Sequence, residues 1–477
     1  MIRFDEIITT ISQSSQTKNN VMSDGLLQCS YQQLPSILAH FAVYFSQRSI
    51  KPSACIAFEC KNNLPAALTL LSLFHRGQSF VLLPQSGHQL KQPGFKAVVP
   101  DFCDYSLTVT TENINYQQPE AFLQLQPLTA TKLKPQLSDL EANLYARTSG
   151  SMGAAKIIVH QQNGVLVNAR HYARRYQLSA TDRVAIPLPI FHLYALCAGF
   201  LPALCQGASI CLLDRVNILS YLDMERKFQP NVAFFTPALC EMLLTGRRKS
   251  GGYRLVITSG DRIKASLFKD FNHKFGTLIN QYGSTEMGGI AASSPDDPFQ
   301  QRLTTTGKAM PGMQLKVDED GILHCKPQHG FVACLDSQGK CLNKIAADGW
   351  FKTGDLATID ENNQLIILGR ADNQVNRSGF LVTLSDIEQK LENIAGVAQA
   401  IVLSAEREEQ SGRGQQLLAF CLLQRKYDLD AQQIRAACFG LLPKYAIPDH
   451  IKIIKQIPVL ANGKVDRQTL LQQTESL

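Results

Sequence analysis

The sequence lacks the cysteine patterns of metal-binding and disulfide-linked proteins. Its thirteen cysteines are an odd number, and no two stand at the two-residue spacing of a zinc knuckle or a redox motif. Most lie in apolar runs, where a thiol behaves as a small hydrophobic side chain. The N-terminus carries acidic residues and no apolar segment of the kind that a signal peptide needs. We therefore expect a protein of a reducing compartment, with a cytoplasmic location.

Charged residues are also scarce, at 18% of the chain. The 47 basic and 40 acidic residues leave a formal charge of +7, and no basic cluster is interleaved with aromatic side chains. Nucleic acid is therefore not an expected partner. One stretch, 184–213, holds no charged residue and is long enough to cross a bilayer. Pro187, Pro189, His192 and Pro202 interrupt it, so we expect a buried strand, loop and helix here and no transmembrane segment.

Hydrophobic residues make up 45% of the 477 residues, which is enough for large cores and excludes a disordered chain. Helical patterns alternate with short apolar strands as far as about residue 258, which predicts an α/β fold with mostly parallel sheets flanked by helices. From about Gly307, short alternating segments predict a small β-barrel-like subdomain. A compact βα pattern then predicts a small α+β domain, so we expect a large domain at 1–369 and a small one at 370–477.

A loop rich in glycine and hydroxyl groups follows the apolar segment 142–146. It runs Thr148-Ser149-Gly150-Ser151-Met152-Gly153, with Lys156 three residues later. Glycines let a phosphate approach the backbone, and the hydroxyl and N–H donors match its oxygens. The spacing differs from a Walker A loop, which disfavours a P-loop kinase or ATPase. An ordinary surface turn is the alternative interpretation of this loop.

A second motif, 281–286, follows a short apolar strand. Tyr282 beside Gly283 can cover a purine ring, Ser284 and Thr285 can reach a phosphate, and Glu286 can hold Mg²⁺. The alternative is a capping box in which Ser284 or Thr285 starts a helix.

Three further residues stand on glycine turns or close to them. Asp355 follows Gly354 and is suited to a ribose diol, while Arg370 follows Gly369 and is suited to a phosphate. Lys464 follows Gly463 near the end of the chain, where a solvated surface lysine is the alternative interpretation.

In this order, the motifs resemble the acyl-adenylate-forming superfamily, and the resemblance covers nearly the whole chain. That superfamily comprises acyl- and aryl-CoA synthetases, adenylation domains of peptide synthetases, and luciferases. The matching elements are 31–34, the loop 148–156, 189–192, 282–286, 306–308, 354–355, 369–388 and 463–464.

The resemblance implies a two-step reaction with ATP and Mg²⁺. A carboxylate attacks the α-phosphate to give an acyl-adenylate and pyrophosphate, and a thiol then displaces AMP. Lys464, Thr285 and Glu286 would be catalytic, with Glu286 as the metal ligand. The nucleotide would be bound by Thr148, Ser149, Gly150, Ser151, Met152, Gly153, Lys156, Gly260, Asp261, Tyr282, Gly283, Ser284, Asp355 and Arg370.

The resemblance also implies that the small domain rotates between the two steps about a hinge near Asp372. Lys464 would then leave the site, and the loop with Gly379 and Phe380 would approach the thiol's pantetheine arm. The residues expected to bind the acid or the thiol are Phe191, His192, Phe234, Met287, Gly288, Gly379 and Phe380.

Departures from the family pattern narrow the expected function. His192 stands where amino-acid-activating relatives carry an aspartate, which favours a fatty or aryl acid, although His192 could equally be a core histidine. Met152 replaces a hydroxyl residue and Leu381 an arginine. With thirteen residues after Lys464, we expect a separate acceptor: CoA or a discrete acyl carrier protein. The alternatives are a nucleotide- and acid-binding sensor or partner subunit with impaired adenylation, and a stand-alone amino-acid adenylation enzyme.

Overall fold

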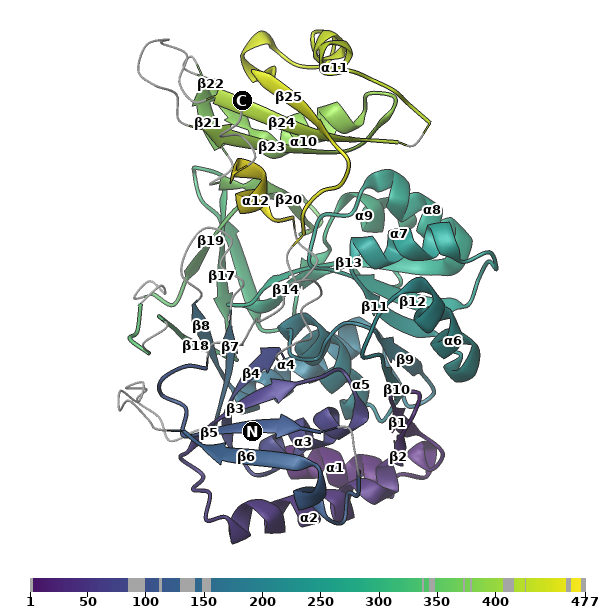
Figure 1. The fold of residues 1–477 in the computed structure, drawn as a ribbon, viewed down its shortest axis with the longest axis vertical. Coiled ribbons are helices and arrows are strands. Elements are labelled where there is room, and N and C mark those ends of the chain that lie inside the picture. Colours follow the sequence, from purple (N-terminus) through teal and green to yellow (C-terminus); the bar gives the residue numbers. More distant parts are fainter. Residues whose placement is uncertain are drawn as a thin grey trace.

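The computed structural model describes most of the chain (Figure 1). The described residues are 3–84, 99–110, 114–128, 142–147, 156–336, 339–342, 348–371, 374–377, 380–405, 416–424, 426–459 and 465–472.

A seven-stranded sheet forms in the first part of the chain, with the order β18-β8-β7-β4-β3-β5-β6. Its inner strands β7, β4, β3 and β5 are parallel, and the outer strands β6, β8 and β18 pair antiparallel. The strands are β3 (Cys55–Cys60), β4 (Ser79–Pro84), β5 (Tyr105–Val109), β6 (Leu123–Pro127), β7 (Asn143–Arg147), β8 (Ile157–Gln161) and β18 (Phe331–Leu335).

A nine-stranded sheet has the order β15-β14-β13-β12-β11-β9-β10-β1-β2. It is parallel from β13 to β1, and β14, β15 and β2 pair antiparallel at its edges. The strands are β1 (Val21–Ser23), β2 (Gln28–Ser30), β9 (Arg183–Ile186), β10 (Ser209–Leu212), β11 (Val232–Phe235), β12 (Tyr253–Thr258), β13 (Gly276–Ser284), β14 (Gly288–Ala292) and β15 (Lys308–Ala309).

Helices cover both sheets, and α3 lies in the core shared by the two sheets. Every residue of α3 from Leu64 to Phe74 is buried, which explains why its sequence is apolar on all sides. On the other face of the nine-stranded sheet, α6, α7 and α8 pack over a second core. The helices are α1 (Phe4–Gln13), α2 (Leu34–Gln47), α3 (Leu64–His75), α4 (Gln162–Arg175), α5 (Leu201–Cys205), α6 (Ile218–Phe228), α7 (Pro237–Gly246), α8 (Ala265–Phe275) and α9 (Phe299–Thr304).

The uncharged stretch 184–213 contains most of β9, a π-helix (Tyr194–Phe200), α5 and β10. Most of it is buried, as the prediction of a core segment requires: β9 and β10 lie within the nine-stranded sheet, and the π-helix and α5 pack against α4. In the described part of the chain, no helix is both long enough and apolar enough to span a membrane.

The antiparallel subdomain predicted from Gly307 onward is a four-stranded sheet of order β16-β17-β19-β20. It packs over a core that it shares with the β13–β14 turn and with β14, and this core includes Met287, Leu323 and Phe351. Its strands are β16 (Met313–Val317), β17 (Ile322–Pro327), β19 (Phe351–Ile359) and β20 (Leu365–Arg370).

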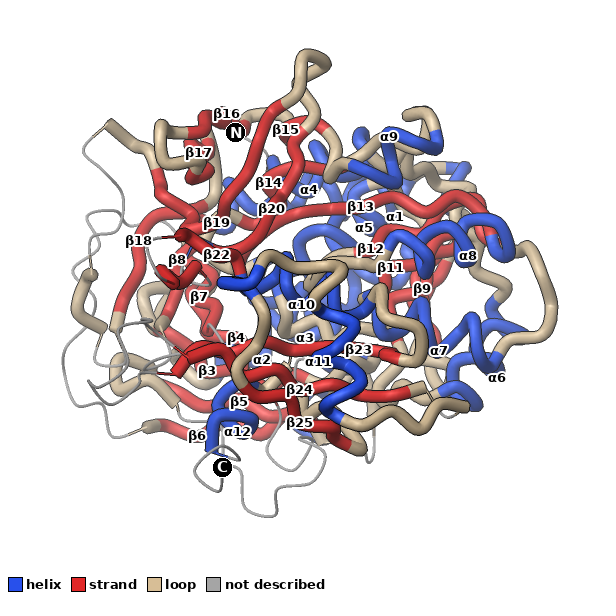
Figure 2. Tube along the Cα trace, turned by 90° about the horizontal axis from the view of Figure 1, so that it is seen from above, coloured by secondary structure: helices blue, strands red, loops and turns tan. Residues whose placement is uncertain are grey.

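The last part of the chain forms a small α+β unit with its own apolar core, at the top of Figure 1. It stands above the edges of the larger sheets, and Figure 2 views the molecule from this end. Its elements are β21 (Gln374–Arg377), β22 (Phe380–Thr383), α10 (Leu384–Glu392), β23 (Val397–Ala405), β24 (Gln416–Leu423), α11 (Ala431–Cys438), β25 (His450–Ile454) and α12 (Arg467–Gln472). The predicted fold class is therefore confirmed.

Candidate active site

The turn between β13 and β14 carries the second motif. β13 ends at Ser284, and residues 285–287 reverse the chain into β14. The reversal depends on glycine, since a Cβ on Gly283 would lie 2.3 Å from the Gly288 carbonyl oxygen, and Gly288 has φ +68°. The Ser284 hydroxyl accepts a hydrogen bond from the Met287 N–H at 3.1 Å. The alternative interpretation, that a helix starts at Ser284 or Thr285, is wrong because the chain continues as a strand.

Three residues predicted to bind the nucleotide lie together where β13 meets the barrel-like subdomain. The Tyr282 phenol donates a hydrogen bond to Oδ2 of Asp355. Arg370 stands directly opposite Asp355 in the β19–β20 register, and its guanidinium lies 3.4 Å from Oδ1. Burial and the Asp355 carboxylate both raise the pKa of Tyr282, so the phenol remains a donor. The Asp355 side chain is only 14% exposed, whereas Arg370 is half exposed.

Asp355 is held in place by the residues that precede it on β19. Gly354 has φ +77°, a conformation that favours glycine. The Thr353 hydroxyl accepts a hydrogen bond from the Asp355 N–H at 3.0 Å and donates one to the Leu323 carbonyl at 2.9 Å. Thr353 was missed by sequence reasoning, although it stands in the same short motif as Asp355.

Two residues that the sequence did not point to hold the backbone of the turn 285–287 and of the start of β14. His160 on β8 donates from Nε2 to the Thr285 carbonyl oxygen at 2.8 Å. Tyr172 on α4 accepts a hydrogen bond from the Gly289 N–H through its phenol oxygen. Thr285 and Glu286 themselves are partly exposed, so their side chains remain accessible from solvent.

Gly260 and Asp261 lie just beyond the carboxyl end of β12. This strand runs parallel to β13, with Thr258 opposite Asn280, so both strands end at the same edge of the sheet. Gly260 has φ +95°, and both predicted residues are exposed. Ligands of open α/β sheets bind outside the carboxyl ends of the strands, and these two residues occupy such a position beside Tyr282.

The residues predicted to bind the acid divide between two cores. The Phe191 and His192 rings lie 4.3 Å apart between centroids, and Phe191 packs against the core that contains Phe234. Phe234 is fully buried and contacts the rings of Tyr176 and Tyr194 edge to face. By contrast, Met287 is buried in the barrel core and lies outside the cluster that contains Phe234, and Gly288 is only partly buried.

Tyr194 begins the π-helix and is a further residue that the sequence analysis did not select. Its phenol donates to the Ile257 carbonyl at 2.8 Å and lies 3.2 Å from the Phe235 carbonyl. Burial raises its pKa well above the ordinary value, so the phenol stays neutral. The wall around Phe234 therefore presents neutral aromatic rings.

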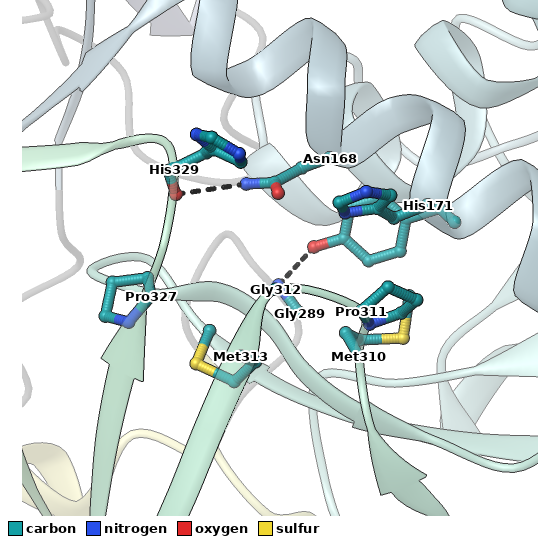
Figure 3. Close-up of a pocket in the computed structure, with 10 residues that line it drawn as sticks. Asn168, His171, Gly289, Met310, Pro311, Gly312, Met313, Pro327 and His329 are labelled. Carbon is teal, nitrogen blue, oxygen red and sulfur yellow. Dashed lines mark hydrogen bonds between the residues drawn. The ribbon is translucent and has the colours of Figure 1, made fainter.

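A small cavity lies between α4 and the strands β14 to β17 (Figure 3). Its lining includes His171, Tyr172, Gly289 and His329, and Asn168 donates to the His329 carbonyl at 3.3 Å. The cavity volume of about 10 Å³ has room for about one water molecule. It can therefore hold neither a nucleotide nor an acyl group.

Several predicted site residues lie outside the described residues. These are Thr148, Ser149, Gly150, Ser151, Met152, Gly153, Asp372, Gly379 and Lys464. Lys156 directly precedes β8, and Phe380 begins β22.

Glu286 is a described residue whose chemistry fits a magnesium ligand. The described residues contain no group of three or more His, Cys, Asp or Glu side chains that could hold a metal. Mg²⁺ in phosphate-transfer sites commonly takes one or two carboxylates plus phosphate oxygens and water. The partly exposed Glu286 carboxylate is suited to that arrangement.

Together, the parallel sheet and the residues at its edge define an α/β protein with a candidate nucleotide site. Residues 13–330 match the family model described as AMP-binding enzyme, and residues 386–464 match the model of the AMP-binding enzyme C-terminal domain. The first match covers more than half of the chain. The chain belongs to the AMP-binding enzyme family, which confirms the family predicted from the motifs.

Two curated relatives and one solved structure illustrate the similarity. Indoleacetate--CoA ligase of Aromatoleum aromaticum is 24% identical over 476 residues, covering 93% of this chain and 92% of the relative. A 3-[(3aS,4S,7aS)-7a-methyl-1,5-dioxo-octahydro-1H-inden-4-yl]propanoyl:CoA ligase of Rhodococcus jostii is 23% identical, covering 68% of this chain and 64% of the relative. The crystal structure of ATP-bound MatB from Rhodopseudomonas palustris has a TM-score of 0.82 at 17% identity, covering 99% of each chain. At that identity the structural similarity concerns the fold alone.

Proposed function

We propose that this protein activates a carboxylic acid with ATP as an acyl-adenylate and then transfers the acyl group to a thiol. Pyrophosphate leaves in the first step and AMP in the second. The observation that carries the proposal is the contact of Asp355 with both Tyr282 and Arg370, beside the turn that carries Glu286. Relatives named as CoA ligases support the reaction class.

In this reaction a carboxylate must approach a triphosphate, so neutralising negative charge matters more than moving protons. Asp355 would accept hydrogen bonds from the ribose hydroxyls, and the Tyr282 ring would cover adenine beside Gly260 and Asp261. Arg370 would face a phosphate. Bound Mg²⁺ would supply charge neutralisation at the phosphates, and Glu286 is the residue that would hold it.

The remaining roles follow the family resemblance. Thr148 to Gly153 and Lys156 would surround the β- and γ-phosphates, and Thr285 would touch the α-phosphate. Lys464 would bridge the carboxylate and the α-phosphate in the first step. Gly379 and Phe380 would line the path of the pantetheine arm in the second step, after rotation about a hinge near Asp372.

For the acid, we propose an uncharged fatty or aryl tail. The aromatic rings near Phe234 are neutral, and His192 occupies the position at which an α-ammonium would need a carboxylate partner. The acceptor is CoA or the phosphopantetheine arm of a discrete acyl carrier protein. All thirteen cysteines are free thiols, and eleven are buried, which supports a reducing, cytoplasmic compartment.

The experiment that tests the proposal is acid-dependent exchange of pyrophosphate into ATP. The panel contains short, medium and long fatty acids, benzoate and cinnamate derivatives, and amino acids. We expect exchange with at least one fatty or aryl acid and loss of exchange in Glu286→Gln. Exchange only with amino acids would favour the amino-acid adenylation enzyme. ATP binding without exchange would favour the sensor or partner subunit.

A further inference from the structure

His160 is a buried histidine that the proposed mechanism does not use. It lies on β8, is 5% exposed, and contacts the ring of Phe331 edge to face at 6.1 Å between centroids. Its Nε2 lies 2.8 Å from the Thr285 carbonyl oxygen. Since a carbonyl oxygen can only accept a hydrogen bond, Nε2 carries the proton and is the donor.

The strand that carries His160 is paired on both sides. His160 lies opposite Leu144 of β7 and opposite Phe331 of β18. β8 therefore belongs to the interior of the seven-stranded sheet, whereas Thr285 follows β13 of the nine-stranded sheet. The hydrogen bond thus connects the two sheets at the turn that carries Thr285 and Glu286.

The surroundings of the imidazole keep it in one place. Gly330 has φ +102°, and a Cβ there would lie 3.6 Å from Nδ1 of His160. Helix α4 approaches the same glycine closely, since a Cβ on Gly164 would lie 2.4 Å from the Gly330 nitrogen. Gly330 therefore lies in van der Waals contact with the imidazole, and Gly164 lets helix α4 pack directly against Gly330.

We propose that His160 is a positioning residue that orients the turn 285–287 through the Thr285 carbonyl. The inference rests on the proposed function, because it assigns the turn a role in binding Mg·ATP. The bond fixes the peptide group between Thr285 and Glu286. It therefore sets the directions of both the Thr285 hydroxyl and the Glu286 carboxylate, which would contact the α-phosphate and the metal.

Position matters here because catalytic and metal-binding groups tolerate little displacement. A shift of about 1 Å in such a group can cost about a hundredfold in rate. The other hydrogen bonds at the turn are donated by the Met287 N–H to the Ser284 hydroxyl and by the Gly289 N–H to the Tyr172 phenol oxygen, and neither involves the peptide group between Thr285 and Glu286. Loss of His160 should therefore weaken the contacts of Mg·ATP with the turn and leave contacts with adenine and ribose in place.

The test compares His160→Gln with His160→Asn. The amide nitrogen of glutamine can reach the position of Nε2, while the shorter asparagine cannot reach the Thr285 carbonyl. Both variants introduce the same polar group, so a difference between them reports the hydrogen bond. His171→Asn is the matched control, since His171 lies on α4 in the small cavity of Figure 3.

The readout is the affinity for ATP by calorimetry, with Mg²⁺ and with a chelator. We expect His160→Asn to weaken ATP binding about tenfold with Mg²⁺, the cost of about one hydrogen bond, and to change it less than about twofold with the chelator. His160→Gln and His171→Asn should bind within about threefold of the wild type under both conditions. In steady-state pyrophosphate exchange, His160→Asn should raise the KM for Mg·ATP and leave the KM for the acid unaltered.

Two results would overturn the proposal. One is equal weakening by His160→Asn with and without Mg²⁺, which would show a general structural role. The other is equal behaviour of His160→Gln and His160→Asn. ATP binding requires neither acid nor thiol, so a failure of the ligase reaction would be seen separately in the exchange assay and would leave this test intact.

Discussion

The Tyr282 phenol and the Asp355 carboxylate are hydrogen-bonded to each other across a sequence separation of 73 residues. The bond joins the residue proposed to cover adenine to the residue proposed to bind ribose. It also joins β13 of the large sheet to β19 of the barrel-like subdomain. The adenosine site therefore depends on the packing of these two parts, and the two side chains should act together.

A double-mutant cycle tests this coupling. Tyr282→Phe removes the donor, and Asp355→Ala removes the proposed ribose contact together with the acceptor. A hydrogen bond to a charged group contributes about 1.5–3 kcal/mol, so each single change should weaken ATP binding about tenfold or more. The double variant should weaken ATP binding by less than the product of the two single-variant fold changes. The measurement is the Kd for ATP, and an unchanged affinity in Asp355→Ala would refute the ribose assignment.

Lys464 provides a test of the two-step mechanism. Lys464→Ala should lower acid-dependent pyrophosphate exchange about a hundredfold or more, because charge stabilisation at the α-phosphate is lost. Formation of the thioester from a supplied acyl-adenylate should remain, since the proposal places Lys464 outside the site in that step. Lys455→Ala, at an exposed position in the same small domain, is the control and should retain both activities. Equal loss of the two steps in Lys464→Ala would contradict the proposal.

Much of the fold could be predicted from local sequence patterns. The apolar segments at 232–235 and 255–258 form β11 and the end of β12, and the helical pattern at 64–74 lies within α3. These elements are buried on all sides, so their runs of apolar residues are an unambiguous signal. The π-helix was not predicted. It packs so closely on Phe234 that a Cβ on Gly199 would lie 3.3 Å from that ring, a tertiary contact that local patterns do not show.

The candidate site could be predicted only where its residues form short motifs. Tyr282, Glu286 and Asp355 stand beside glycines and hydroxyl residues, and such clusters indicate a ligand site. His160 had no such signal, because it contacts Thr285 across 125 residues of sequence. Its role depends on how two sheets lie against each other, and the sequence of a single strand does not show that arrangement.

The neighbouring residues Phe234 and Phe235 allow a matched test of the acid site. Both are fully buried on β11, but Phe234 faces Tyr176 and Tyr194, whereas Phe235 faces Tyr221 and Phe271 on the opposite side of the sheet. Phe234→Leu should shift the ratio of kcat/KM toward a larger acid by about tenfold, the effect of about one methylene in an apolar pocket. Phe235→Leu removes the same volume and should leave that ratio unchanged. The measurement is pyrophosphate exchange with two acids that differ in size. An equal shift of the kcat/KM ratio in both variants would contradict the assignment of Phe234 to the acid site.

His171 should make stability depend on pH. Burial lowers its pKa, and the neighbouring His329 and Arg174 lower it further, while the Pro311 carbonyl acts in the opposite direction. The unfolded chain therefore binds a proton at this position more readily than the folded chain does, and acid favours unfolding. The contribution of His171 to stability should be complete above its ordinary pKa of about 6.5 and should decrease as the pH falls toward the lowered value. His171→Gln removes the titration, so the fall in Tm from neutral pH to about pH 5.5 should be smaller than in the wild type. Thermal unfolding of both proteins across this range measures the difference, and parallel Tm curves would show that His171 does not contribute to the acid sensitivity.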